Sequence, residues 1–130
     1  MIDQEERWMK LRTELLLFAI FSTKETDYHK AELAAGKINM ALGALRLIQP
    51  FNWNGWLRER GGWPTMEEAK TMDLNDCVRT LTAISRSDRV CEGNLAGAIA
   101  SGMVRELVER AHEMSYGAEV QPLPEIQVKQ

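Results

Sequence analysis

The 130-residue chain has little cysteine, no excess of positive charge and no long apolar run. Its two cysteines, Cys77 and Cys91, cannot form a disulfide framework and do not lie in a C-x-x-C pair, so we expect a reducing compartment. The longest apolar run, LLLFAIF at 15–21, is far shorter than the roughly 20 residues that span a bilayer. The start, MIDQEERWMK, lacks the basic and apolar regions of a secretion signal. We therefore expect a cytoplasmic protein without a membrane anchor.

The net charge and the length of the chain indicate its partner class and its domain organisation. Sixteen Lys and Arg residues against nineteen Asp and Glu leave a net charge of −3, whereas nucleic-acid binders normally present a basic surface to phosphates. We therefore expect no nucleic-acid partner. The length suits one domain, which we place at 1–115. Residues 116–130 contain two prolines and no periodic pattern, and we expect an extended C-terminal tail.

Apolar side chains recur every three or four residues along most of the chain, which predicts an all-α fold, a compact bundle of about five helices. Thr65 and Glu68 have the spacing of a capping box, and Asp73 can cap the helix that follows. Gly36 and Gly43 fall on the expected core side of the second helix and suggest a close helix crossing. The expected helices cover 3–24, 27–48, 65–72, 73–86 and 92–114.

Residues 50–64, PFNWNGWLRERGGWP, show no helical or strand period and predict an aromatic-rich loop between the second and third helices. One interpretation is that its aromatics plug the end of the bundle, since an ordered loop needs apolar anchors to offset its entropy. The other is that they form an interaction surface, stacking on a ligand ring, a base or a partner protein together with nearby arginines. The candidate interaction residues are Phe51, Trp53, Trp56 and Trp63.

A cluster of charges, SRSDRVCEG at 85–93, connects the last two expected helices. Its candidate ligand-binding residues are Arg86, Asp88, Arg89, Cys91 and Glu92. They form either a structural network, with Arg89 paired to Asp88 or Glu92, or a polar pocket in which two guanidinium groups bind an anion. The small residues that follow, among them Gly97 and Gly102, are expected to let another element pack against the last helix.

No catalytic residue, metal site or cofactor is predicted. Cys91 as a nucleophile would need a general base, and His29 and His112 are both distant in sequence, so a buried, inert thiol is the simpler expectation. No two candidate zinc ligands lie at the usual spacing. Because the apolar run at 15–21 points in every direction on a helix, another element or another subunit must cover it, and we expect a homo-oligomer, most simply a dimer.

Two segments carry a family resemblance. The first is an F-x-W-x-x-W box and the second an L-T-x-x-x-R-x-D-R-x-C-E-G-x-L segment. Residues 50–110 resemble a family of small bacterial and phage proteins catalogued only as a domain of unknown function, with Val90 where the pattern has phenylalanine. The resemblance implies that both segments belong to one unit and brings no activity with it. The matching residues are Phe51, Trp53, Trp56, Leu81, Thr82, Arg86, Asp88, Arg89, Cys91, Glu92, Gly93 and Leu95.

Two classes of function remain. The first is a non-catalytic helical interaction protein, an accessory of a phage or mobile element, whose partner protein the sequence does not identify. The alternative is a domain that binds a small anionic or nucleotide-like ligand, or an enzyme, centred on Arg86, Arg89, Cys91 and Glu92. A deep pocket around these four residues would favour the alternative.

Overall fold

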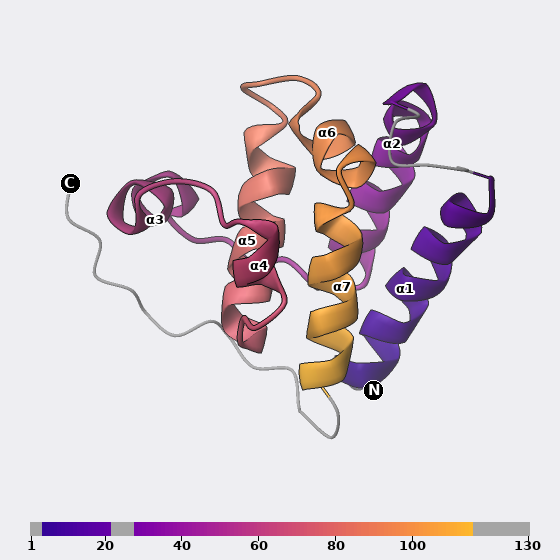
Figure 1. Ribbon diagram of the computed structural model, residues 1–130, viewed down its shortest axis with the longest axis horizontal. Coiled ribbons are helices and arrows are strands. Elements are labelled where there is room, and N and C mark those ends of the chain that lie inside the picture. Colours follow the sequence, from indigo (N-terminus) through magenta and orange to yellow (C-terminus); the bar gives the residue numbers. More distant parts are fainter. Residues whose placement is uncertain (1–3, 22–27, 116–130) are drawn as a thin grey trace.

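The computed structural model describes residues 4–21 and 28–115, with side chains described within 5–13 and 31–115. These residues form seven helices and no strand, so the all-α prediction is confirmed with more helices than expected (Figure 1). None of the described helices is long and apolar enough to cross a membrane. The helices are α1 (Gln4–Phe21), α2 (Tyr28–Ala44), α3 (Trp53–Arg60), α4 (Met66–Ala69), α5 (Leu74–Ser87), α6 (Asn94–Ala100) and α7 (Met103–Met114).

Helix α5 is the central helix of the fold and packs against α3, α6 and α7. From Cys77 to Ser87 every residue except two arginines is buried. The hydroxyl groups of two buried threonines are satisfied inside the helix: Thr80 donates to the carbonyl oxygen of Asp76 and Thr82 to that of Val78, each at 2.7 Å. The buried hydroxyl of Ser85 donates to Oδ1 of Asn39 in α2. These bonds let a helix with several polar residues lie in the interior.

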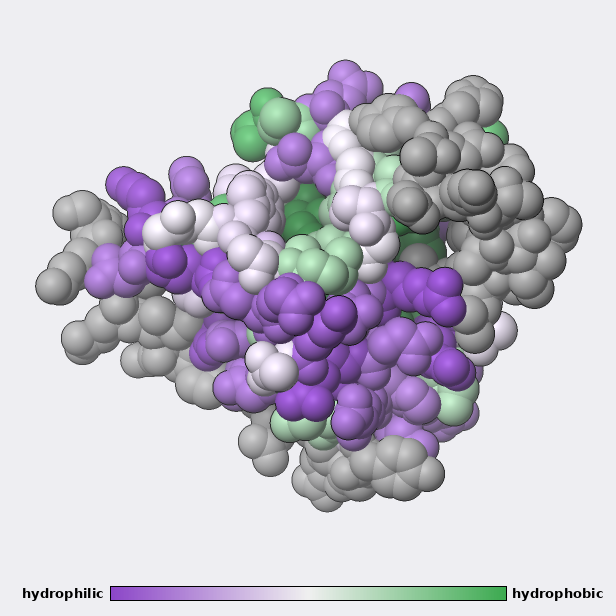
Figure 2. Space-filling model, viewed as in Figure 1, coloured by the Kyte–Doolittle hydropathy of each residue, from purple (hydrophilic) through white to green (hydrophobic). Residues whose placement is uncertain are grey.

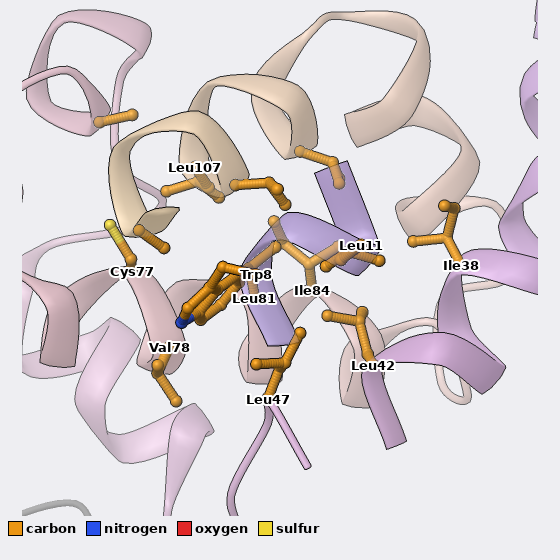
Figure 3. Close-up of a cluster of buried hydrophobic side chains, with 14 of the residues drawn as sticks. Trp8, Leu11, Ile38, Leu42, Leu47, Cys77, Val78, Leu81, Ile84 and Leu107 are labelled. Carbon is orange, nitrogen blue, oxygen red and sulfur yellow. The ribbon is translucent and has the colours of Figure 1, made fainter. Parts of the chain in front are cut away.

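The core joins helices that are far apart in the sequence. Helix α1 packs on α7, and α2 packs on α6 and α1. At the surface the Nε atom of Arg12 in α1 lies 2.9 Å from both carboxylate oxygens of Glu109 in α7. Figure 3 shows the side chains that meet in the interior. They include Trp8 and Leu11 of α1, Ile38 and Leu42 of α2, Leu81 and Ile84 of α5, and Leu107 of α7.

The caps predicted for α4 and α5 are confirmed. Thr65 Oγ1 accepts from the N–H of Glu68 at 3.1 Å, while the Glu68 carboxylate accepts from the N–H of Thr65 at 3.0 Å. That backbone hydrogen bond is the main cause that lowers the pKa of Glu68. Asp73 Oδ1 accepts from the N–H of Asp76 at 2.8 Å. Both helices therefore begin where their side-chain acceptors allow.

The predicted aromatic loop is wrong over 53–60, which form α3. Asn52 Oδ1 accepts from the N–H of Gly55 at 3.1 Å, and Gly61, at φ +89°, ends the helix in the left-handed region. Trp56 is buried, with the Phe51 ring edge-on at 5.8 Å and the Arg60 guanidinium 5.5 Å from its ring centre. Eight residues with mixed polarity are too few to show a period, so only the caps could have indicated this helix.

Two other helices differ from expectation. The predicted helix 92–114 is divided into α6 and α7 by Gly102, whose φ of +87° lies in the left-handed region. Gly36 and Gly43 of α2 are exposed rather than turned to the core, and a Cβ added to either would meet no atom within 4 Å. The close helix crossing predicted for them is therefore absent from the described fold. The side chains of the apolar run at 15–21 and the tail at 116–130 lie outside the described residues.

Candidate functional site

The turn between α5 and α6 is built around the side chain of Asp88. Its Oδ1 atom accepts hydrogen bonds from the backbone N–H groups of Gly93 and Leu95, each at 3.1 Å. These amides need an acceptor because Gly93, at the N-cap of α6, has no side chain to provide one. Gly93 also has a φ of +99°, which favours glycine. Asp88 and Gly93 therefore have defined structural roles in this turn.

A second pair of side chains ties the two helices together. Ser87 Oγ donates to the carbonyl oxygen of Ile84 at 3.0 Å and accepts from Nδ2 of Asn94 at 2.9 Å. The side-chain oxygen of Asn94 has no hydrogen-bond partner among the described residues. The first residue of α6 thus keeps a free acceptor beside the turn.

The five residues of the predicted charged cluster lie along this turn but are not gathered around a cavity. Arg89, Cys91 and Glu92 are exposed, and Arg86 is half-buried. Within residues 28–115 no ion pair joins Arg89 to Asp88 or Glu92, so that prediction is wrong. The physical reason is that Asp88 is occupied by backbone amides. Anion binding by the two arginines stays a prediction.

The two cysteines lie in opposite environments. Cys77 is fully buried, and burial raises the pKa of its thiol to about 12, which keeps it neutral and unreactive at neutral pH. Cys91 is exposed, which corrects the expectation of a buried thiol. His112 lies in the last turn of α7, and this end of α7 is at the other end of the bundle from the α5–α6 turn that contains Cys91 (Figure 1). The side chain of His29 lies outside the described residues. No described group of His, Cys, Asp or Glu residues could hold a metal ion.

A pocket of about 310 Å³ lies directly beside the turn. Helices α5 and α6 and the start of α7 form its walls, together with the segment that precedes α4. Figure 2 shows this hollow near the centre of the view, with hydrophobic atoms at its base. Its lining residues are Trp63, Pro64, Thr80, Ile84, Gly93, Asn94, Gly97, Ala98, Ser101 and Met103.

The pocket exists because one face of α6 carries small residues. Gly93, Gly97 and Ser101 follow one another at four-residue intervals and all line the space. A Cβ added to Gly97 would meet no atom within 4 Å. The sequence suggested that another element packs against the small residues of this helix; α2 does pack on α6, but the space at Gly97 is open. Trp63, 45% exposed, also lines the pocket.

The polar side chains of the lining are few, and two of their hydroxyl groups already donate within the chain. The hydroxyl of Thr80 donates to the carbonyl oxygen of Asp76 at 2.7 Å, and that of Ser101 donates to the carbonyl oxygen of Ala98 at 3.1 Å. Asn94 has a free side-chain oxygen, as described above. None of the ten lining residues is ionisable. The pocket is therefore suited to a neutral ligand with few polar groups, and the Asn94 oxygen can accept one hydrogen bond from it.

Sequence reasoning placed the functional site one turn away from this pocket. It singled out Trp63 as part of an interaction surface and Gly93 as a bend in the chain. It did not predict that the two residues line one pocket. Pro64, Thr80 and Asn94 were missed. The available signal was the spacing of Gly93, Gly97 and Ser101, which marks a strip of helix without large side chains. What lies opposite that strip depends on how the helices pack.

Fold and site together define a small all-α domain with an apolar pocket between its helices. Over residues 22–117 the chain matches the family of unknown function DUF6508, and it belongs to that family. The matched residues include the whole described pocket and the α5–α6 turn. No curated protein and no solved structure matches the chain.

Proposed function

We propose that this protein is a non-catalytic binding domain that takes a small, neutral aromatic ligand into the pocket beside the α5–α6 turn. The observation that carries the proposal is the lining of that pocket, which combines apolar walls, a few polar groups and an exposed tryptophan. Such a combination is typical of ligand sites. General acid–base or nucleophilic catalysis needs side chains that move protons or attack, and the lining contains none that is suited to either role.

The size of the pocket indicates the size of the ligand. A protein cavity of about 150 Å³ accommodates benzene, so the 310 Å³ found here suit a two-ring molecule. The half-exposed ring of Trp63 would lose water contact as the ligand enters, and aromatic pairs gain from edge-on or offset contacts. An aromatic ligand therefore uses the one large side chain of the lining that is still exposed.

The polarity of the pocket indicates the functional groups. A carboxylate or ammonium group would lose its hydration without meeting an opposite charge, since no lining side chain is charged. A single N–H or O–H group would find the free oxygen of Asn94. We therefore take indole as the simplest probe of the ligand class. Anion binding at Arg86 and Arg89 would be a separate site.

Calorimetric titration with indole tests the proposal. Saturable binding is expected for the natural chain and a loss of at least tenfold in affinity for Gly97→Leu, whose side chain fills the pocket. Gly43→Leu is the matched control because it adds the same side chain to an exposed glycine in α2. Indole-3-carboxylate should bind more weakly than indole. Unchanged indole binding by Gly97→Leu, or tighter binding of the carboxylate, would contradict the proposal.

A tryptophan-containing peptide separates a free ligand from a partner protein, because a partner could supply the ring as a side chain. The expectation of a non-catalytic interaction protein, and of an accessory of a phage or mobile element, stays a prediction. Indole that binds where the peptide does not favours the small-molecule ligand proposed here. Peptide binding without indole binding would instead indicate that the pocket is a protein-interaction site.

A further inference from the structure

The outer face of α2 carries large apolar residues and glycines that are exposed in the described fold. Leu33 is 65% exposed and Met40 is 76% exposed. Gly36 and Gly43 lie along the same stripe and are also exposed. We call these four residues the outer stripe of α2. The opposite side of the helix holds the core residues Ala31, Ala34, Ile38 and Leu42.

Packing among the described residues does not explain the glycines of the outer stripe. Glycine weakens a helix relative to alanine because it loses more conformational freedom on folding. At Gly36 and Gly43 a Cβ would meet no atom within 4 Å, so packing among the described residues does not require glycine at either position. Glycine would be required at these positions if a helix of another molecule packed closely against α2.

We propose that the outer stripe of α2 is a self-association surface, on which the α2 helices of two copies pack antiparallel across a two-fold axis near residue 38. In this register Leu33, five positions before the axis, faces the glycine five positions after it. Met40, two positions after the axis, faces the glycine two positions before it. Each large side chain therefore enters the space above a glycine. A parallel pair would place leucine on leucine and glycine on glycine.

Charge also favours the antiparallel pair. Glu32 lies at the edge of the outer stripe near the start of α2, and Arg46 lies just beyond the end of the helix, and both are exposed. The proposed register brings Glu32 close to Arg46 of the partner subunit, and the two-fold axis repeats this contact at the other end. Lys37, near the axis, can direct its charge to water along its flexible stem.

The proposed interface is small, so the dimer is expected to be weak. One pair of short helices falls below the roughly 1,200 Å² of buried surface that marks stable complexes. Dimers should therefore appear in the high micromolar range. The surface contains no residue of the Trp63 pocket, and the proposal does not depend on ligand binding there.

Sedimentation velocity at increasing concentration tests the proposal. The natural chain should shift towards a dimer, and Gly43→Leu should remain monomeric at the same concentrations because its side chain occupies the space for Leu33 of the partner subunit. Gly97→Leu, on α6, is the matched control and should dimerise as the natural chain does. A natural chain that stays monomeric, or a dimer that Gly43→Leu leaves unchanged, would overturn the proposal.

Oxidative cross-linking tests the register itself. In a Cys91→Ser background, a mixture of Gly36→Cys and Met40→Cys chains should form a cross-linked heterodimer, since these positions face each other. Each variant alone should cross-link at least fivefold more slowly. Faster cross-linking of Gly36→Cys with itself would indicate a parallel pair and overturn the antiparallel register. The cross-link also reads out the geometry when a bulky substitution affects folding.

Discussion

The Oδ1 atom of Asp88 lies 3.1 Å from the backbone nitrogen of Leu95, so a side chain at the end of α5 caps the first turn of α6. The negative charge is placed where the N–H groups of α6 converge, which is favourable for a carboxylate. For Asp88, this contact favours the structural interpretation of the charged turn over the interpretation as a ligand-binding pocket. Its carboxylate accepts hydrogen bonds from the turn and forms no ion pair with Arg89.

Asp88→Ala should lower the free energy of unfolding by about 1–2 kcal/mol, the usual cost of removing a helix-capping side chain. Asp88→Asn keeps an acceptor oxygen and should lose less. Arg89→Ala should remain within about 0.5 kcal/mol of the natural chain, because this exposed residue forms no ion pair with Asp88 or Glu92. Urea denaturation measures all three. Equal losses in the free energy of unfolding for Asp88→Ala and Arg89→Ala would instead support the ion pair predicted from the sequence.

Trp56→Ala should lower the free energy of unfolding by about 3–5 kcal/mol, because this buried ring holds α3 on the bundle between Phe51 and Arg60. Trp63→Ala should cost clearly less, since 45% of that residue is already exposed, and it should weaken indole binding instead. Chemical denaturation of each variant is the measurement. A Trp56→Ala chain with the natural midpoint would show that α3 is not part of the core.

Two glycines should respond to alanine with opposite signs. Gly97→Ala should raise the free energy of unfolding by about 0.5–1 kcal/mol, because the site is helical and its Cβ has free space. Gly102→Ala should lower it by about 1–2 kcal/mol, because a φ of +87° is unfavourable for any residue with a Cβ. Thermal or chemical denaturation of the two variants gives the comparison. Stabilisation of both would mean that α6 and α7 can form one continuous helix.

The buried thiol of Cys77 should make the fold sensitive to alkaline pH. Its pKa is raised from 9.0 to about 12, so between these values the unfolded chain loses a proton that the folded chain retains. The free energy of unfolding should then fall as pH rises through this window, by up to about 1.4 kcal/mol per pH unit. Cys77→Ala should show a shallower slope over the same range. If the free energy of unfolding falls equally steeply with pH in the natural chain and in Cys77→Ala, ionisation of Cys77 does not cause the loss of stability.

The thiols should also differ in reactivity. Cys91 is exposed and should react with Ellman's reagent in the native protein, whereas Cys77 should react only after unfolding. Counting reactive thiols with and without denaturant is sufficient, and Cys91→Ser provides the control. Two thiols that react at equal rates in the native protein would contradict the burial of Cys77.

Local signals in the sequence were sufficient for part of the fold. The acceptors Thr65 and Asp73 set the starts of α4 and α5, because a cap depends on residues only three positions apart. The break at Gly102 was missed, since a periodic apolar face continues from Leu95 to Leu107 across it. A glycine in a helical pattern does not reveal whether its φ is negative or positive.

The pocket could not be predicted because it depends on contacts between distant segments. The free strip of α6 was visible in the sequence, but the presence of Trp63 and Thr80 in the same pocket depends on how segments far apart in the sequence come together. The outward orientation of Gly36 was also misjudged. It lies two positions from Ile38, which is about 200° of rotation around a helix, so the helical spacing itself places Gly36 on the outer side once Ile38 is in the core.

Helix α6 has only seven residues, and glycines at φ +99° and +87° stand at its two ends. The direction of the chain on entering and leaving this helix is therefore set by backbone conformations that residues with a Cβ rarely adopt. The residues between the two glycines do not determine the direction of the chain. A library that keeps Gly93 and Gly102 and varies Gly97, Ala98 and Ser101 should thus yield folded proteins with differently shaped pockets, which makes this short helix a natural place to engineer ligand preference.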